Sequence, residues 1–173
     1  MYRRVSDIDW ESWEPRERAT LLFIVRDGEI LLIHKKRGLG AGKINGPGGR
    51  IEPGETPVAC AIREVQEELL VTPTGVEPSG ELFFQFVDGL SMHGYVFRAS
   101  GCEGEPQETG EATPHWVSPD ELPYERMWED DRYWMPLMLE GTPFKGYFIF
   151  DDDTMLDHHV DVYVHTPRED ASP

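Results

Sequence analysis

Apolar residues recur at helical spacing in one central stretch of the chain. Between Val58 and Leu69 they return every three or four positions, which is the period of one face of an α-helix. Thr56 is a favourable N-cap, and Pro57 suits the first helical position. A helix is therefore predicted over residues 56–69. Its apolar core face would consist of Val58, Ala61, Ile62, Val65 and Leu69.

Runs rich in β-branched and aromatic residues predict strands on both sides of this helix. Asp27-Gly28 is a strong hairpin signal between the first two runs. Pro73 and Pro78 indicate a loop after the helix, and the acidic, glycine-bearing segment 101–110 has no periodicity and is expected to be a mobile loop. The predicted strands cover residues 19–25, 29–34, 81–87, 91–97, 115–117, 145–150 and 155–164.

A second helix is predicted over residues 130–140, because Gly141 follows it as a C-terminal signal. Strands with two interspersed helices indicate a mixed α/β layer structure. We expect one domain over residues 19–164. Residues 1–18 would form an N-terminal extension that docks loosely through Trp10 and Trp13, and residues 165–173 a disordered tail.

The composition narrows the classes of partner. A formal net charge of −17 disfavours nucleic-acid polymers and anionic membranes, which call for basic patches. The chain has only two cysteines, which provide no disulfide framework, and Cys60 is expected in the core. We find neither a signal peptide nor an apolar run of the ~18 residues that span a bilayer. A soluble, cytoplasmic protein that binds a small molecule is expected, as a monomer or homodimer.

Glutamates gather on one face of the predicted helix. Glu64, Glu67 and Glu68 fall together at helical spacing, and Glu55 lies close to its N-terminal end. Each like-charge pair costs about 0.2–0.5 kcal/mol on a helix, so a cation between them would relieve the repulsion. Hard oxygen ligands favour Mg²⁺, with Mn²⁺ as a further possibility. The alternative is a solvated acidic face, but that does not explain the glycine-rich segment 46–49 before the helix.

These residues resemble the signature of the Nudix hydrolases, G-x5-E-x7-R-E-U-x-E-E-x-G-U, where U is apolar. Leu70 stands where the family has its second glycine, so the turn that leaves the helix is expected to be rebuilt. The resemblance implies the Nudix α/β/α sandwich, with a mixed sheet and two main helices. The matching residues are Gly49, Glu55, Arg63, Glu64, Val65, Glu67, Glu68 and Val71.

Within this family the chain is similar to the MutT-type enzymes that hydrolyse oxidised purine nucleoside triphosphates. The similarity rests on stretches such as Lys35-Lys-Arg-Gly, Met127-Trp128 and Gly146-Tyr-Phe. It implies a pocket in which Asn45, Asp130 and Asp131 hydrogen-bond the purine edge and Trp128 stacks on its face. The other pocket residues implied are Thr20, Lys35, Gly48, Gly49, Phe84 and Met92.

Each of these residues also has a structural interpretation. Trp128 could belong to the core, Asp130-Asp131 could cap a helix, and Asn45 could form a turn. The basic loop 35–43 could bind phosphates or be a flexible surface loop. Leu39, Ile44 and Pro47 replace aromatic residues of the animal enzymes, which leaves the base preference open.

The resemblance implies a metal-dependent hydrolysis that yields a nucleoside monophosphate and pyrophosphate, a reaction that clears damaged nucleotides from the pool. Glu67 or Glu68 is the first candidate for the general base, and Arg63 would hold Glu67 in place. Glu111 is a further candidate for metal or base. Two alternatives remain: another Nudix substrate, such as a dinucleoside polyphosphate, a nucleotide sugar or a capped RNA, and a catalytically silent nucleotide-binding domain.

Overall fold

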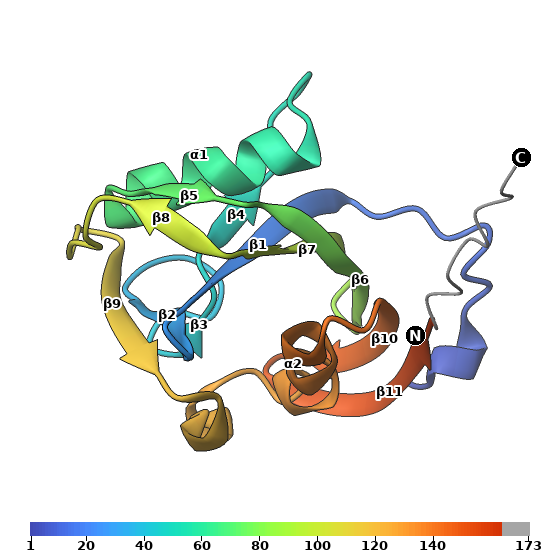
Figure 1. Ribbon diagram of the computed structural model, residues 1–173. Helices are drawn as coiled ribbons and strands as arrows, with labels where there is room; N and C mark the ends of the chain where they lie inside the picture. Colours follow the sequence, from blue (N-terminus) through green and yellow to red (C-terminus); the bar gives the residue numbers. More distant parts are fainter. Residues whose placement is uncertain (164–173) are drawn as a thin grey trace, which may run out of the picture.

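A 9-stranded mixed sheet forms the centre of the protein, and α1 (Pro57–Leu69) and α2 (Asp131–Glu140) lie on opposite sides of it (Figure 1). The computed structural model describes residues 1–163. Three short 3-10 helices are η1 (Val5–Asp7), η2 (Pro119–Glu121) and η3 (Tyr124–Arg126). The strands are β1 (Glu17–Arg26), β2 (Glu29–Lys35), β3 (Ile44–Asn45), β4 (Gly48–Arg50), β5 (Thr72–Thr74), β6 (Glu77–Phe86), β7 (Ser91–Ala99), β8 (Gly101–Glu103), β9 (Ala112–Val117), β10 (Phe144–Asp151) and β11 (Thr154–Val162).

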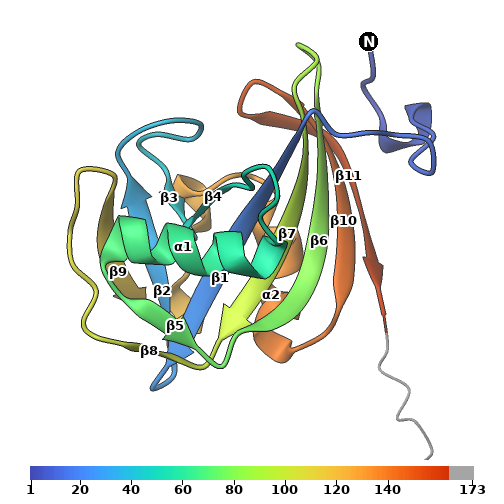
Figure 2. The ribbon, with the colours of Figure 1, turned by 90° about the horizontal axis from the view of Figure 1, so that it is seen from above.

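The sheet divides into two branches at β1 (Figure 2). One edge of β1 pairs in parallel with β7, and β6, β10 and β11 continue that branch. The other edge pairs with β2 only next to the hairpin turn, where Val25 faces Ile30, and with β4 at its beginning. Because β1 and β2 separate beyond the turn, a space opens between the two branches.

Alternation along β1 supplies both layers of the core. Leu22 and Ile24 point toward α1 and pack with its buried side chains, whereas Phe23 points to the other side and meets the ring of Trp134 on α2 at 5.8 Å between centroids. Each face of the strand is therefore covered by one helix. This arrangement confirms the predicted layers of helix, sheet and helix.

The predicted helix 56–69 is confirmed as α1. The hydroxyl of Thr56 accepts a hydrogen bond from the backbone N–H of Ala59 at 3.2 Å, as an N-cap does. Cys60 is buried in the core, as expected. The placement of Val58 in the core was wrong, because its side chain is 41% exposed. It lies in the first turn of the helix, which follows the exposed residues 52–54, and it points away from the buried Cys60 side of that turn.

The turn after α1 also differs from the expectation. It is not rebuilt: Leu70 adopts the left-handed conformation, with φ 59° and ψ 32°, and its N–H donates to the carbonyl of Gln66 at 3.0 Å. The neighbours Leu69 and Val71 are both buried, so the chain must reverse within one residue. The turn therefore keeps the conformation typical of glycine while the Leu70 side chain points outward, 55% exposed.

Two segments interpreted as loops contain strands. Pro73 lies within β5, which pairs with β8, and Pro78 lies within β6 beside a register shift. The expectation of a mobile loop over residues 101–110 was therefore wrong at its start. The rest of that segment is held against the end of α1, because Thr109 donates to the carbonyl of Glu68 at 2.8 Å and the N–H of Gln107 to that of Leu69 at 2.9 Å. The sequence of this segment shows no periodicity because hydrogen bonds to α1 hold it in place, and it does not form a helix or strand with one apolar face.

The other predicted elements are confirmed with small changes in length. Asp27 and Gly28 form the predicted hairpin turn with φ values of 51° and 76°, and α2 ends at Gly141 in the left-handed region, with φ 74°. In residues 1–163 no helix has the length and apolar character needed to cross a membrane. The predicted tail, residues 165–173, lies outside the described residues.

The N-terminal segment packs on the outer face of the β6–β10 branch. Trp10 and Trp13 lie against the rings of Phe83 and Tyr147, with centroid distances of 5.0 to 6.3 Å. The indole N–H of Trp13 donates to the side-chain oxygen of Gln85 at 2.9 Å. Since β1 begins at Glu17, the segment outside the sheet ends two residues earlier than the predicted boundary at 18.

Candidate functional site

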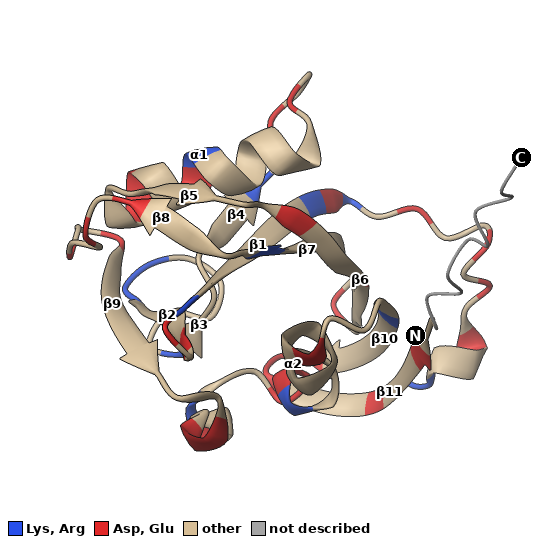
Figure 3. Cartoon of the chain, viewed as in Figure 1, with Lys and Arg blue, Asp and Glu red and all other residues tan. Residues whose placement is uncertain are grey.

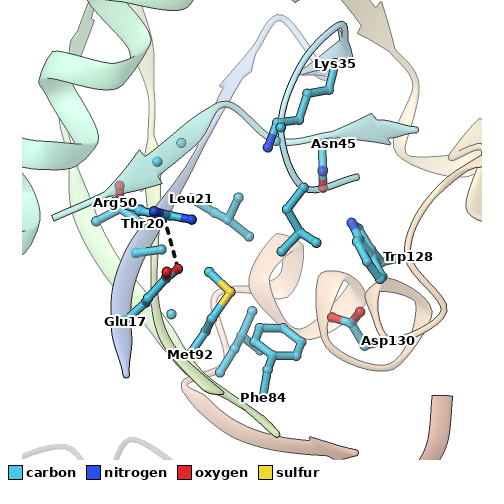
Figure 4. A pocket seen from close by; sticks show the side chains of 18 of the residues that line it. Glu17, Thr20, Leu21, Lys35, Asn45, Arg50, Phe84, Met92, Trp128 and Asp130 are labelled. Carbon is cyan, nitrogen blue, oxygen red and sulfur yellow. Dashed lines mark ion pairs between the residues drawn. The ribbon is translucent and has the colours of Figure 1, made fainter. Parts of the chain in front are cut away.

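A cavity of about 590 Å³ occupies the space between the two branches of the sheet (Figure 4). One end reaches Glu68 of α1, and the other reaches Asp130 and Asp131 at the start of α2. The structure brings all of the predicted substrate-binding residues to the wall of this one cavity. They are Thr20, Lys35, Asn45, Gly48, Gly49, Phe84, Met92, Trp128, Asp130 and Asp131.

An arginine organises the carboxylates next to the cavity. The guanidinium of Arg63 forms two hydrogen bonds with Glu55, from Nε at 2.7 Å and from Nη2 at 2.9 Å. Its Nη1 donates to Glu64 at 3.0 Å and to Glu67 at 3.3 Å. The hydrogen bonds from Arg63 lower the pKa of Glu55 to about 2, so this carboxylate stays ionised. Arg63 therefore orients three glutamates, where only its contact with Glu67 was predicted.

Glu68 differs from the other glutamates because it is buried. Only 5% of its surface is exposed, and within residues 1–163 its Oε2 has no hydrogen-bond partner. Burial, together with the charge of Glu64, raises the pKa of Glu68 to about 8, while Lys35 acts in the opposite direction. Burial also raises the pKa of Glu64. A buried carboxylate oxygen without a partner costs free energy, which a ligand with positive charge would recover.

Gly48 and Gly49 allow the wall of the cavity to approach other groups closely. A Cβ atom on Gly48 would collide with the carbonyl of Thr20, and one on Gly49 with the carboxyl group of Glu64. Any other residue at these positions would push β4 away from β1 or displace the Glu64 carboxylate. The glycine-rich segment is thus needed to place the carboxylates beside the cavity.

At the opposite end, two adjacent aspartates are almost completely buried. Asp130 is 2% exposed and Asp131 4% exposed, and the indole N–H of Trp134 donates to Oδ2 of Asp130 at 2.7 Å. Burial raises the pKa of Asp130 to about 6. Burial and the neighbouring Asp130 raise the pKa of Asp131 well above its usual range. The raised pKa values of both groups favour a proton held by the pair, which would then offer both a donor and an acceptor.

The structure bears on the structural interpretations of these residues. Asp130 occupies the N-cap position of α2, but its side chain forms no capping hydrogen bond. Asn45 is in β3, opposite Ile33, and not in a turn. Trp128 is half-buried; its ring is nearly perpendicular to the rings of Phe86 and Phe150 in the core, and it also lines the cavity. Core packing thus holds the indole at the cavity wall.

The basic loop after β2 is only partly directed at the cavity. Lys35 lines it, and burial lowers the pKa of this lysine while Glu68 opposes that shift. Lys36 instead pairs with Glu108 at 2.6 Å, and Lys43 lies 5.2 Å from the ring centroid of Trp128. Acidic residues are spread along the chain, whereas the loop after β2 is one of the few basic segments (Figure 3).

Several residues of the prediction lie beside the cavity and not in its wall. Glu55, Arg63, Glu64 and Glu67 form the network around the guanidinium. Glu111 is exposed, and its charge raises the pKa of Glu68 and Glu64. Glu17 and Arg50 also line the cavity, although neither was predicted from the sequence. The sequence signal for both residues was weak, because Glu17 is the first residue of a strand and Arg50 directly follows Gly48 and Gly49.

The architecture and the site define the class of protein. The NUDIX domain family matches residues 15–138, so the chain belongs to the Nudix family. The Oxidized purine nucleoside triphosphate hydrolase of Danio rerio is 42% identical over 144 residues, covering 82% of this chain and 92% of that protein. The protein of the same name from Mus musculus is 38% identical over 143 residues, with 82% and 92% covered. Among solved structures, a MutT protein from Bacillus halodurans has a TM-score of 0.75 at 26% identity, covering 84% of this chain and 97% of that one.

Proposed function

We propose that this protein is a nucleoside triphosphate pyrophosphohydrolase that acts on oxidised purine nucleotides of the 8-oxo-dGTP type. The products would be the nucleoside monophosphate and pyrophosphate. The observation that carries the proposal is that one cavity has Glu68 at one end and the buried aspartate pair at the other. A nucleoside triphosphate has the matching polarity, with an anionic chain at one end and a flat heterocycle at the other. The names of the Danio rerio and Mus musculus relatives agree with this substrate class.

The aspartate pair would read the base. A purine edge presents donors and acceptors in a fixed order, and oxidation changes that order. Because the pair retains a proton, it can match a donor and an acceptor on the same edge, while Asn45 adds its amide group. Leaving one of these buried groups unpaired costs about 1–3 kcal/mol, which is the basis for discrimination between bases. Trp128 would stack on the face of the ring.

Nudix hydrolases generally need a divalent metal ion, and the residues of this chain fit one. Glu68 offers a buried oxygen without a partner in residues 1–163, and the carboxylate of Glu64 is adjacent. Within those residues no three acidic, histidine or cysteine side chains surround one point, since Arg63 draws Glu55, Glu64 and Glu67 toward itself. Mg²⁺ commonly completes its ligands with water and substrate phosphates, so a pair of carboxylates suffices to begin a site. Mn²⁺ takes the same oxygen ligands.

When bound, the metal ion would neutralise charge on the phosphate oxygens and activate water. The chain itself would contribute positioning. Lys35 would hold the phosphate chain, and Arg63 would keep the ion-pair network of Glu64 and Glu67 in register. Glu68 or Glu67 would take the proton of the attacking water, and Glu111, on the adjacent segment, remains the further candidate.

The proposed enzyme works on free nucleotides in the cytoplasm, and its net charge of −17 disfavours polymeric nucleic acid as a substrate. The test is hydrolysis of a panel of 8-oxo-dGTP, dGTP, a dinucleoside tetraphosphate and a nucleotide sugar, with Mg²⁺ and with excess chelator, and the nucleotide products and pyrophosphate are resolved by chromatography. We expect Mg²⁺-dependent hydrolysis that is fastest with 8-oxo-dGTP and that releases pyrophosphate from it. Faster hydrolysis of the nucleotide sugar or the tetraphosphate would assign another Nudix substrate. Nucleotide binding without any hydrolysis would indicate a silent domain.

A further inference from the structure

An ion pair crosses the wall of the cavity near its carboxylate end. Nε of Arg50, the last residue of β4, lies 3.1 Å from Oε2 of Glu17, the first residue of β1, and both side chains line the cavity (Figure 4). The strand ladder brings them together, because Ala19 faces Arg50 and the N–H of Ile51 donates to the carbonyl of Arg18 at 2.9 Å. The pair is therefore a built feature of the β1–β4 contact.

The two partners differ in how firmly they are held. The Glu17 side chain is 25% exposed, whereas that of Arg50 is 73% exposed. Arg50 can therefore move away from Glu17 while Glu17 stays in the wall. Ion pairs at such accessible positions contribute little to stability, so breaking this one costs little.

The charges along the cavity make Arg50 valuable to an anionic ligand. Only two basic side chains of residues 1–163, Lys35 and Arg50, line it, and the charge of Arg50 is close enough to influence Lys35. Lys35 is already opposite Glu68. A phosphate chain that enters this end therefore finds one lysine facing a buried carboxylate and one arginine bound to Glu17.

We propose that Glu17 is a displaceable partner of Arg50, and that the phosphate chain of the nucleotide takes its place on the guanidinium. This inference rests on the proposed function, since it assumes a nucleoside polyphosphate as ligand. Glu17 keeps Arg50 at the cavity wall in the free protein and competes with the phosphates for it. It is a positioning residue that lowers the affinity for the phosphate chain through Arg50.

The test is a double-mutant cycle on the full-length protein. The dissociation constants of dGTP and of deoxyguanosine are measured by calorimetry in excess chelator for wild type, Glu17→Gln, Arg50→Gln and the double variant. Glu17→Gln should tighten dGTP by about two- to fivefold, the strength of an accessible ion pair, and leave deoxyguanosine unchanged. Arg50→Gln should weaken dGTP. In the Arg50→Gln background, Glu17→Gln should have no further effect.

A matched control is Glu105→Gln, which removes the same charge from another accessible ion pair, with Arg26 at 3.4 Å, whose residues do not line the cavity. It should leave both dissociation constants unchanged. If Glu17→Gln tightens dGTP equally with and without Arg50, Glu17 acts by direct repulsion and the exchange is refuted. An unchanged affinity in Glu17→Gln, or no binding of dGTP by the wild type, also overturns it. If the cycle behaves as expected but the wild type hydrolyses no nucleotide, the ion-pair exchange stands and the proposed function fails.

Discussion

The indole N–H of Trp134 donates a hydrogen bond to Oδ2 of Asp130 at 2.7 Å, within a buried part of the structure. This bond holds one aspartate of the pair in a fixed orientation. Oδ2 of the neighbouring Asp131 is a buried oxygen without a partner in residues 1–163. The pair is thus anchored on its core side and unsatisfied elsewhere. Buried polar atoms without a partner are rare in folded proteins, and a bound ligand that supplies the partner would account for this one.

The protonation of this pair predicts how stability depends on pH. The pKa values of Asp130 and Asp131 are raised in the folded protein, so the folded state binds the proton more tightly than the unfolded chain. Their contribution to stability is complete below about pH 4, which is the pKa of an aspartate in the unfolded chain. It is lost as the pH rises through the pKa of the folded protein, about 6 for Asp130 and higher for Asp131. Asp131→Asn cannot ionise, so the wild type should lose stability relative to this variant as pH rises from 4 to 8.

The measurement is the thermal midpoint of both proteins across that pH range. The exposed Asp120→Asn removes the same charge and should follow the wild-type curve. If the thermal midpoints of wild type and Asp131→Asn change in parallel from pH 4 to 8, the pair does not hold an extra proton. The proposed recognition of the base would then lack its hydrogen-bond donor.

Glu68→Gln should separate activity from stability. The substitution preserves the shape of the side chain and removes the charge that a metal ion and the attacking water would need, so the rate should fall by roughly 100-fold or more. The free energy of unfolding should not decrease, because the variant no longer buries an ionisable group at 5% exposure. Glu64→Gln should behave likewise. Steady-state rates and chemical denaturation check both parts, with the exposed Glu77→Gln as a control of equal charge. Retention of the wild-type rate by Glu68→Gln would remove it from the site.

Leu70→Gly tests the cost of the left-handed turn. A residue with a Cβ atom is strained at φ 59°, and glycine is not, so this variant should raise the free energy of unfolding by about 0.5–1 kcal/mol. Leu70→Ala keeps the Cβ atom and should bring no such gain. Urea denaturation of the three proteins makes the comparison. Equal stabilisation by alanine would show that the exposed leucine side chain, and not the backbone, was responsible.

The elements that local patterns specify were predictable. The spacing of apolar residues located α1, Asp27-Gly28 located the first hairpin turn, and Gly141 marked the end of α2. These features depend on residues that are close in sequence. The position of Val58 was not predictable in the same way, because its exposure depends on what lies opposite the first helical turn.

The site was predictable as a set of residues but not as an arrangement. The similarity to known enzymes brought together Asn45 and Trp128, which are far apart in sequence and line one cavity. The role of Arg63 as the common partner of Glu55, Glu64 and Glu67 depends on the loop before α1 folding back on the helix. The pairing of Glu17 with Arg50 depends on the register of β1 and β4, which no local pattern in the sequence reveals.

The most direct test of the central claim is a competition assay. An equimolar mixture of 8-oxo-dGTP and dGTP is incubated with Mg²⁺ and either wild type or Asp131→Ala, and the two monophosphates and pyrophosphate are quantified by chromatography. The ratio of products gives the ratio of kcat/KM values directly. We predict that the wild type forms predominantly 8-oxo-dGMP with one pyrophosphate per monophosphate, and that Asp131→Ala, which removes the donor and the acceptor of this side chain, shifts the ratio toward dGMP by about tenfold, as expected for one unpaired buried group. Equal consumption of both nucleotides by the wild type, or an unchanged ratio in the variant, would contradict the assignment of the aspartate pair as the reader of oxidised purines.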